Sequence, residues 1–218
     1  MQIEIWSDIA CPWCYIGSFR LDEALRQFPH RDNVQLVHRS FELHPGYPLD
    51  DTMPVLDMFV QRYGTTREQA RTQEGRLQQV AQQEGLPFSI ERDFGNTRRA
   101  HELVHLADEH GLGHQMMQTL YRTLFSADGT LFTEEGLVSV AVTVGLDAEE
   151  VRAALQSGRY REAVTADEAR AHELGISGVP FFLIDGKYAL SGGQKVSAFV
   201  DVLNQVWEAE EHVPDPAV

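Results

Sequence analysis

The stretch Ser7-Asp8-Ile9-Ala10-Cys11-Pro12-Trp13-Cys14-Tyr15-Ile16-Gly17 contains both cysteines of this 218-residue chain. It follows a segment in which Ile3 and Ile5 alternate with their neighbours, a pattern that predicts a β-strand. Pro12 favours a helix that begins near Cys11, because the fixed φ of proline suits the first helical turn. The two cysteines are therefore predicted to lie at a junction between a strand and a helix.

This position is chemically suited to a reactive thiol. The thiolate is the form that attacks a disulfide, and an ordinary cysteine is mostly protonated at neutral pH. At a helix N-terminus, unpaired N–H groups and the positive end of the helix dipole stabilise an anionic sulfur. We therefore predict that Cys11 is the nucleophile. Cys14, one turn later on the same face, is close enough to resolve a mixed disulfide.

Three other interpretations of the cysteine pair are weaker. A structural zinc site needs about four ligands, and the chain has no second pair of cysteines. A purely structural disulfide would close too short a loop to stabilise the chain much. Two inert, buried cysteines at this spacing remain the third alternative.

Outward from the motif, the chain divides into three parts. Residues 1–49 follow a β-α-β pattern, and residues 157–207 follow an α-β-β-α pattern in which Asp185-Gly186 predicts a hairpin turn. Residues 50–156 between them show helical patterns, including a helix opened by Met53-Pro54. The prediction is an α/β domain whose two halves form one sheet, interrupted by an all-helical insertion. The acidic tail, 208–218, is expected to fray.

The composition limits the classes of function. The net charge of −15 disfavours binding to nucleic acid and to anionic membranes. The N-terminus shows no signal-peptide pattern, and no apolar run is long enough to span a membrane. We therefore expect a soluble protein of the cytoplasm, where a lone Cys-x-x-Cys is more often redox-active or metal-binding than structural.

Ile176-Ser177-Gly178-Val179-Pro180-Phe181 is the second notable stretch. Proline at the start of a strand donates no hydrogen bond to the sheet, and a turn here could contain a cis peptide bond. An ordinary strand-entry proline is the alternative, and the sequence alone does not decide between them.

The chain resembles the DsbA-like oxidoreductases of the FrnE type. The resemblance rests on the two stretches above and on three others: Arg39-Ser40-Phe41-Glu42-Leu43-His44-Pro45, Asn96-Thr97-Arg98-Arg99-Ala100-His101 and Leu190-Ser191-Gly192-Gly193-Gln194. It implies a thioredoxin fold interrupted by a helical domain, disulfide exchange with protein thiols or disulfides, and no bound cofactor or metal.

The resemblance also implies roles for individual residues. Val179–Pro180 would be a cis bond beside the catalytic pair, Cys11 and Cys14, and the backbone of Val179 would pair with an extended substrate. Pro12 and Trp13 would tune the redox potential of the cysteine pair, and Trp13 would also cover the surface of the site. Many thioredoxin-fold enzymes have a buried acid six residues before the nucleophile. That position is Ile5 here, which leaves the proton acceptor for Cys14 unidentified.

Relatives of the same fold supply a second candidate function. Hydroxychromene-carboxylate isomerases and kappa-class glutathione transferases depend on glutathione, and they typically carry serine at the position of Cys11. The presence of both thiols favours disulfide exchange, with glutathione as a potential co-substrate and a glutathione-dependent isomerase or transferase as the alternative. The resemblance is compatible with a monomer or a homodimer.

His101-Glu102-Leu103-Val104-His105 matches the His-Glu-x-x-His pattern of zinc metallopeptidases and falls on a predicted helix. A third ligand is missing, because His110 does not fit the longer zinc motif and nothing singles out Glu134 or Glu135. We therefore predict ordinary helix residues here, with a metallopeptidase as the less favoured alternative.

Overall fold

A four-stranded mixed sheet with the order β2-β1-β5-β6 forms the centre of the structure, a computed structural model that describes residues 1–127 and 129–211. β1 (Gln2–Ser7) pairs in parallel with β2 (Gln35–Ser40) and antiparallel with β5 (Phe181–Ile184). β5 pairs antiparallel with β6 (Tyr188–Ser191) through the predicted hairpin. The two α/β halves thus meet in one sheet, as the sequence predicted.

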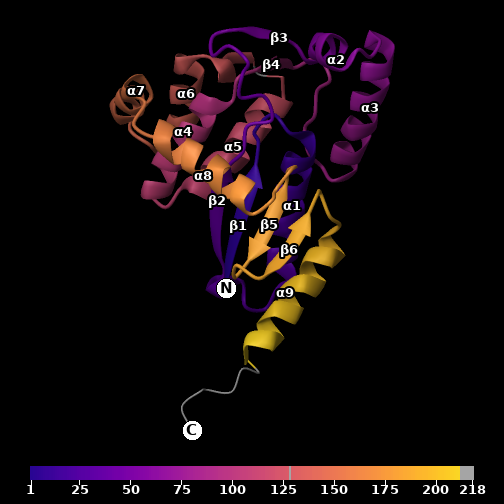
Figure 1. The fold of residues 1–218 in the computed structure, drawn as a ribbon, viewed down its shortest axis with the longest axis vertical. Helices are drawn as coiled ribbons and strands as arrows, with labels where there is room; N and C mark the ends of the chain where they lie inside the picture. The colour runs from indigo at the N-terminus through magenta and orange to yellow at the C-terminus, as the bar shows by residue number, and fades with distance from the viewer. Residues whose placement is uncertain (128, 212–218) are drawn as a thin grey trace.

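Alternation along β1 gives each face of the sheet its own packing partner. Ile3 and Ile5 pack with α1 (Pro12–Gln27) and α9 (Val196–Glu211) on one face. Trp6 points to the other face, where it packs with Ala171 of α8 (Arg161–Glu173). Figure 1 shows α9 beside the sheet and α8 crossing its other face.

The helices between β2 and α8 gather at one end of the sheet (Figure 1). They are α2 (Val55–Tyr63), α3 (Arg67–Gln83), α4 (Arg98–Glu109), α5 (Gly113–Phe125), α6 (Glu134–Val144) and α7 (Ala148–Ser157). Two 3-10 helices, Arg31–Asn33 and Gly129–Phe132, complete the described helical turns. The fold is the expected α/β thioredoxin fold with a helical insertion.

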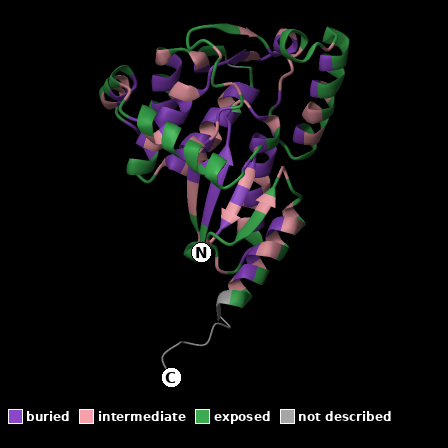
Figure 2. Ribbon diagram, in the orientation of Figure 1, coloured by how far each residue is buried: buried purple, intermediate pink, exposed green. Residues whose placement is uncertain are grey.

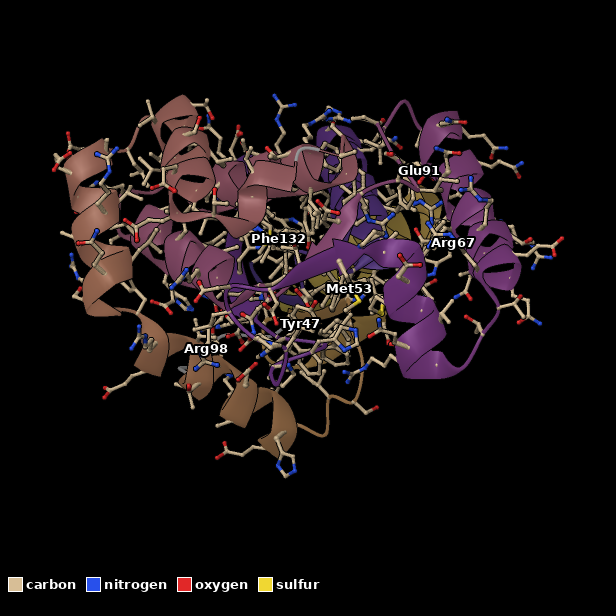
Figure 3. The ribbon with its side chains drawn as sticks, turned by 90° about the horizontal axis from the view of Figure 1, so that it is seen from above. Tyr47, Met53, Arg67, Glu91, Arg98 and Phe132 are labelled. Atoms are coloured by element: carbon tan, nitrogen blue, oxygen red, sulfur yellow. The ribbon has the colours of Figure 1, made fainter. Side chains whose placement is uncertain are left out.

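The insertion differs from the prediction at a short β-ribbon. β3 (Thr52–Pro54) pairs antiparallel with β4 (Asp93–Gly95), and α2 begins at Val55 rather than at Met53. The later start of α2 follows from Pro54, which has an extended backbone and serves as the N-cap of α2. Figure 3, which looks down on this end, shows the strand that carries Met53 running toward α2.

One continuous core joins the insertion to the cysteine motif. Cys11, Cys14 and Tyr15 belong to the same buried cluster as Tyr121 and Phe125 of α5. Tyr15 stacks on Phe125 with ring centroids 4.7 Å apart. Figure 2 shows buried residues continuing from the sheet into the helices beyond it.

The predicted boundaries at 49/50 and 156/157 remain predictions. α9 extends to Glu211, so residues 208–211 of the predicted tail are helical, and residues 212–218 lie outside the described part of the chain. Among the described helices, none has the length and apolar character needed to cross a membrane.

Candidate active site

Cys11 is the N-cap of α1, and its sulfur accepts a hydrogen bond from the backbone N–H of Cys14 at 3.3 Å. Pro12 follows in the first turn, as predicted. Both cysteines are free thiols, and Cys11 and Cys14 are 6% and 1% exposed. A developing negative charge on Cys11 would therefore meet a backbone donor at the positive end of the helix.

Cys14 lies deeper than Cys11. Burial raises the pKa of the Cys14 thiol well above its usual value, and the hydrogen bond and charge of Cys11 act in the same direction. Cys14 therefore stays protonated at neutral pH, which suits a thiol that reacts second.

The Val179–Pro180 segment lies directly beside Cys11. The Cys11 thiol donates to the carbonyl oxygen of Val179 at 3.7 Å, and the Val179–Pro180 peptide bond is cis. The structure thus brings together residues 168 positions apart that the resemblance had placed in one site.

Two glycines allow the segments of the site to approach one another. A Cβ on Gly17 would lie 3.3 Å from both Gly193 Cα and Pro180 Cγ, and a Cβ on Gly193 would lie 2.8 Å from Trp13 Cε3. Trp13 consequently packs over the turn between β6 and α9 while 41% of its surface remains exposed.

A cavity of about 430 Å³ opens beside Pro12 and Trp13, with Thr65, Gln73 and Glu74 as the polar part of an otherwise apolar lining. Its far wall comes from the insertion, with Phe59 and Tyr63 on α2 and Leu77 on α3. Sequence reasoning assigned no role to Phe59, Tyr63 or Leu77, because only the fold places α2 and α3 next to α1.

The sequence pattern of the DSBA-like thioredoxin domain matches residues 2–204. The chain belongs to this family. The crystal structure of a probable DsbA oxidoreductase from Streptomyces coelicolor is 46% identical, has a TM-score of 0.92 and covers 100% of this chain and 94% of its own. YwbO of Bacillus subtilis (strain 168), described as uncharacterised, is 27% identical, over 84% of this chain and 86% of YwbO.

More distant solved structures share the fold of this chain. The cytosolic disulfide reductase DsbM from Pseudomonas aeruginosa is 17% identical with a TM-score of 0.68, covering 96% of this chain and all of that one. A 2-hydroxychromene-2-carboxylate isomerase is 14% identical with a TM-score of 0.70, covering 99% and 100%. The fold alone is therefore shared by both candidate functions that the sequence suggested.

The His-Glu-x-x-His residues of this DSBA-like chain face different partners. His101 Nε2 lies 3.6 Å from Asp8 Oδ1, and His105 Nε2 lies 3.2 Å from Asp167 Oδ2. Glu102 lies 3.8 Å from Arg161. No cluster of three or more His, Cys, Asp or Glu side chains within residues 1–127 and 129–211 has a metal-binding arrangement. The geometry gives the metallopeptidase alternative no support.

Asp8 is a buried carboxylate behind the cysteines that sequence reasoning missed. Its Oδ2 accepts the N–H of Leu43 at 2.7 Å, and its Oδ1 accepts the N–H of Ala10 at 3.2 Å. Burial alone would raise the pKa of Asp8, but the neighbouring His101 and the Leu43 N–H outweigh it and lower that pKa. Asp8 is therefore a buried anion. The sequence feature that could have identified it is an acidic residue within the apolar stretch around Cys11.

Proposed function

We propose that this DSBA-like chain is a thiol–disulfide oxidoreductase that exchanges disulfides with protein substrates through Cys11 and Cys14. The observation that carries the proposal is the hydrogen bond from the Cys14 N–H to Cys11 Sγ, at the first turn of α1 and beside Val179. The cysteine pair is the redox centre, and the activity needs no other bound cofactor.

The reaction follows from the different depths of the two sulfurs. In the reductive direction, the Cys11 thiolate attacks a substrate disulfide, forms a mixed disulfide and releases the first substrate thiolate. Cys14 then loses its proton and attacks Cys11 Sγ, which releases the second substrate thiolate and leaves the Cys11–Cys14 disulfide. In the oxidative direction the same steps run backward.

Protein substrates are favoured by the surroundings of Cys11. Val179 precedes β5 and lies beside the nucleophile, so its backbone is available to pair with an extended chain. The cavity lined by Trp13, Phe59 and Tyr63 offers apolar surface for side chains next to a substrate cysteine. Pro12, Trp13, Val179 and Pro180 are the proposed substrate-binding residues.

Glutathione is the competing substrate. One structural neighbour is DsbM in the presence of GSH (16% identity, TM-score 0.66), and another is the isomerase described above. A cysteine at position 11 favours exchange over isomerisation. Titration calorimetry with glutathione discriminates the two, because tight binding together with poor exchange would reverse the assignment.

The compartment is part of the proposal. DsbM is described as cytosolic, and we extend that location to this chain. The redox potential of the cysteine pair, measured against glutathione, determines whether oxidation or reduction of substrates is favoured there.

Reduction of insulin by dithiothreitol tests the function. We expect Cys11→Ser to abolish catalysis. Cys14→Ser should form a mixed disulfide that accumulates, seen as an added mass that dithiothreitol removes. A metal chelator is the control and should leave the wild-type rate unchanged. Undiminished turnover by Cys11→Ser would refute the proposal.

A further inference from the structure

The buried stripe of α3 contains one charged residue. Ala70, Glu74 and Ala81 are the buried positions of this helix, and Glu74 is 0% exposed. A carboxylate is costly to bury unless it is paired and hydrogen-bonded. Arg92 donates from Nη1 to Glu74 Oε2 at 2.6 Å. The other oxygen, Oε1, is buried and has no hydrogen-bond partner among the described residues. Half of this carboxylate is therefore unsatisfied.

Arg92 is held on the Oε2 side of Glu74. Its guanidinium lies over the rings of Phe88 and Phe125, at 4.8 and 4.7 Å from their centroids. Its Nη1 also donates to the carbonyl oxygen of Ser89 at 3.0 Å. The ion pair with Arg92 thus accounts for one oxygen of Glu74 and leaves the second without a role in the fold.

A carboxylate that is paired through one oxygen can bind a second basic group through the other. Glu4 does so in this structure, with Arg39 at 2.8 Å from Oε1 and Arg170 at 2.7 Å from Oε2. Glu74 has the equivalent of one of these two partners. We therefore expect its Oε1 to bind a donor that a ligand brings to the site.

Glu74 lines two adjoining cavities beside the cysteine motif. The cavity of about 430 Å³ and a smaller one of about 90 Å³ share Pro12, Phe59, Tyr63 and Glu74 in their linings. Pro12 directly follows Cys11, so both cavities lie beside the predicted nucleophile. A side chain next to a substrate cysteine can therefore enter the space that Glu74 lines.

The lining of the larger cavity matches a basic side chain. Leu77 and the rings of Trp13, Phe59 and Tyr63 suit an aliphatic stem, and the faces of aromatic rings also attract a cation. Glu74 and the Thr65 hydroxyl can accept hydrogen bonds, and Thr65 Oγ1 is also buried without a partner among the described residues. Within the described chain, no lysine or arginine lines this cavity.

We propose that the protein prefers disulfides in which a lysine or arginine adjoins the reactive cysteine, an inference that rests on the function proposed above. As Cys11 attacks the substrate sulfur, the basic side chain lies along Phe59 and Leu77, and its charged head donates to Glu74 Oε1. The net charge of −15 attracts any cationic substrate. Glu74 determines where the cation must stand relative to the cysteine.

Two peptides of identical composition test the preference in the wild-type protein. Each contains one lysine and one cysteine that is blocked as a mixed disulfide with thionitrobenzoate. The lysine adjoins the cysteine in the first peptide and lies at the far end of the second. Stopped-flow absorbance follows the coloured thionitrobenzoate that the reduced protein releases. We expect the first peptide to react about tenfold faster, the range of a hydrogen bond between charged groups.

The two possible failures are distinguishable in this experiment. Equal rates for the two peptides would overturn the preference, because net charge alone acts on both alike. Absence of release from either peptide, or undiminished release by Cys11→Ser, would instead contradict the proposed function itself.

Glu74→Gln tests the carboxylate directly. The amide keeps the size of the side chain but not its charge, so the ratio of the two rates should fall from about tenfold to near one. Glu68→Gln is the matched control, because Glu68 is exposed on the same helix and its replacement removes the same charge. It should keep the wild-type ratio. A ratio that stays high in Glu74→Gln would overturn the proposal.

A second variant keeps the inference testable if Glu74→Gln does not fold, since that variant leaves Arg92 buried without its partner. Tyr63 is 55% exposed, so Tyr63→Leu should fold. It removes an aromatic ring from the cavity and should lower the ratio by about two- to fivefold. Tyr188→Leu, at an exposed tyrosine of β6, is the control and should keep the ratio. An unchanged ratio in Tyr63→Leu would overturn the proposal.

Discussion

At the scale of single residues, the contact between the sheet and α8 is built from paired charges. Glu4 of β1 binds Arg39 at 2.8 Å and Arg170 at 2.7 Å, and Asp167 binds Arg39 at 3.2 Å. Buried charges are tolerated when they are paired in this way. His38 is different, because the group nearest its ring is another imidazole, with His38 Nε2 at 2.9 Å from His114 Nδ1.

His38 should make the protein less stable in mild acid. Burial, followed by the charges of His114 and His101, lowers the pKa of His38 well below 6.5. Below about pH 6.5 the unfolded chain binds a proton at this position that the folded chain does not, so stability falls as the pH falls. From about pH 7.5 to about pH 5.5, the wild type should lose about 1 kcal/mol more free energy of unfolding than His38→Gln.

Urea denaturation at the two pH values measures this difference. His110→Gln is the control, since His110 lies on the surface in an ion pair with Glu150 and its replacement should leave the wild-type pH dependence in place. Equal losses of free energy of unfolding in the wild type and in His38→Gln would contradict the prediction. They would show that the folded chain binds a proton at His38 as readily as the unfolded chain does.

At the scale of elements, the sequence predicted those features whose signals are local. Thr66 and Gln69 form a capping box at the start of α3, a Thr-x-x-Gln pattern of neighbouring residues, and Asp147 caps α7. β3 and β4 escaped prediction because each is three residues long and pairs with the other across 43 positions at Thr52 and Gly95.

The same distinction applies to the site. The arrangement of Cys11 and Cys14 depends on neighbouring residues in the sequence, so the start of α1 could be predicted from the sequence alone. The position of Val179 needed the family resemblance, because no local pattern links it to Cys11. The pair of Asp8 and His101 was missed because α4 reaches Asp8 only through tertiary packing.

Two helical glycines should respond oppositely to alanine. Gly75 lies inside α3 with open space around its Cβ position, so Gly75→Ala should raise the free energy of unfolding by about 0.5–1 kcal/mol through helix propensity. A Cβ on Gly136 of α6 would lie 1.9 Å from the carbonyl oxygen of Thr130, so Gly136→Ala should lower the free energy of unfolding. Urea denaturation of both variants checks the pair, and stabilisation by Gly136→Ala would show that the Thr130 backbone moves freely.

At the scale of the whole molecule, the cysteine pair belongs to the core that joins the insertion to the sheet. Cys11 and Cys14 are buried with side chains of α4, α5 and α6. The insertion therefore packs against the first turn of α1. It also contributes Phe59 and Tyr63 to the cavity beside that turn. Both the proposed reactivity of Cys11 and the proposed substrate surface therefore involve the inserted helices.

Net charge acts on the encounter with substrate. The chain carries 33 acidic and 18 basic side chains, a net charge of −15, so an anionic disulfide is repelled as it approaches Cys11 and a cationic one is attracted. Salt screens both effects, since the Debye length falls from about 30 Å at 0.01 M to about 8 Å at 0.15 M.

Raising the salt concentration over this range should therefore speed the reaction of Cys11 with glutathione disulfide and slow its reaction with cystamine. Each disulfide is the control for the other in a single stopped-flow series on Cys14→Ser, which isolates the first attack. Salt effects of the same sign on both would show that charges close to Cys11, rather than the net charge of the molecule, govern the encounter.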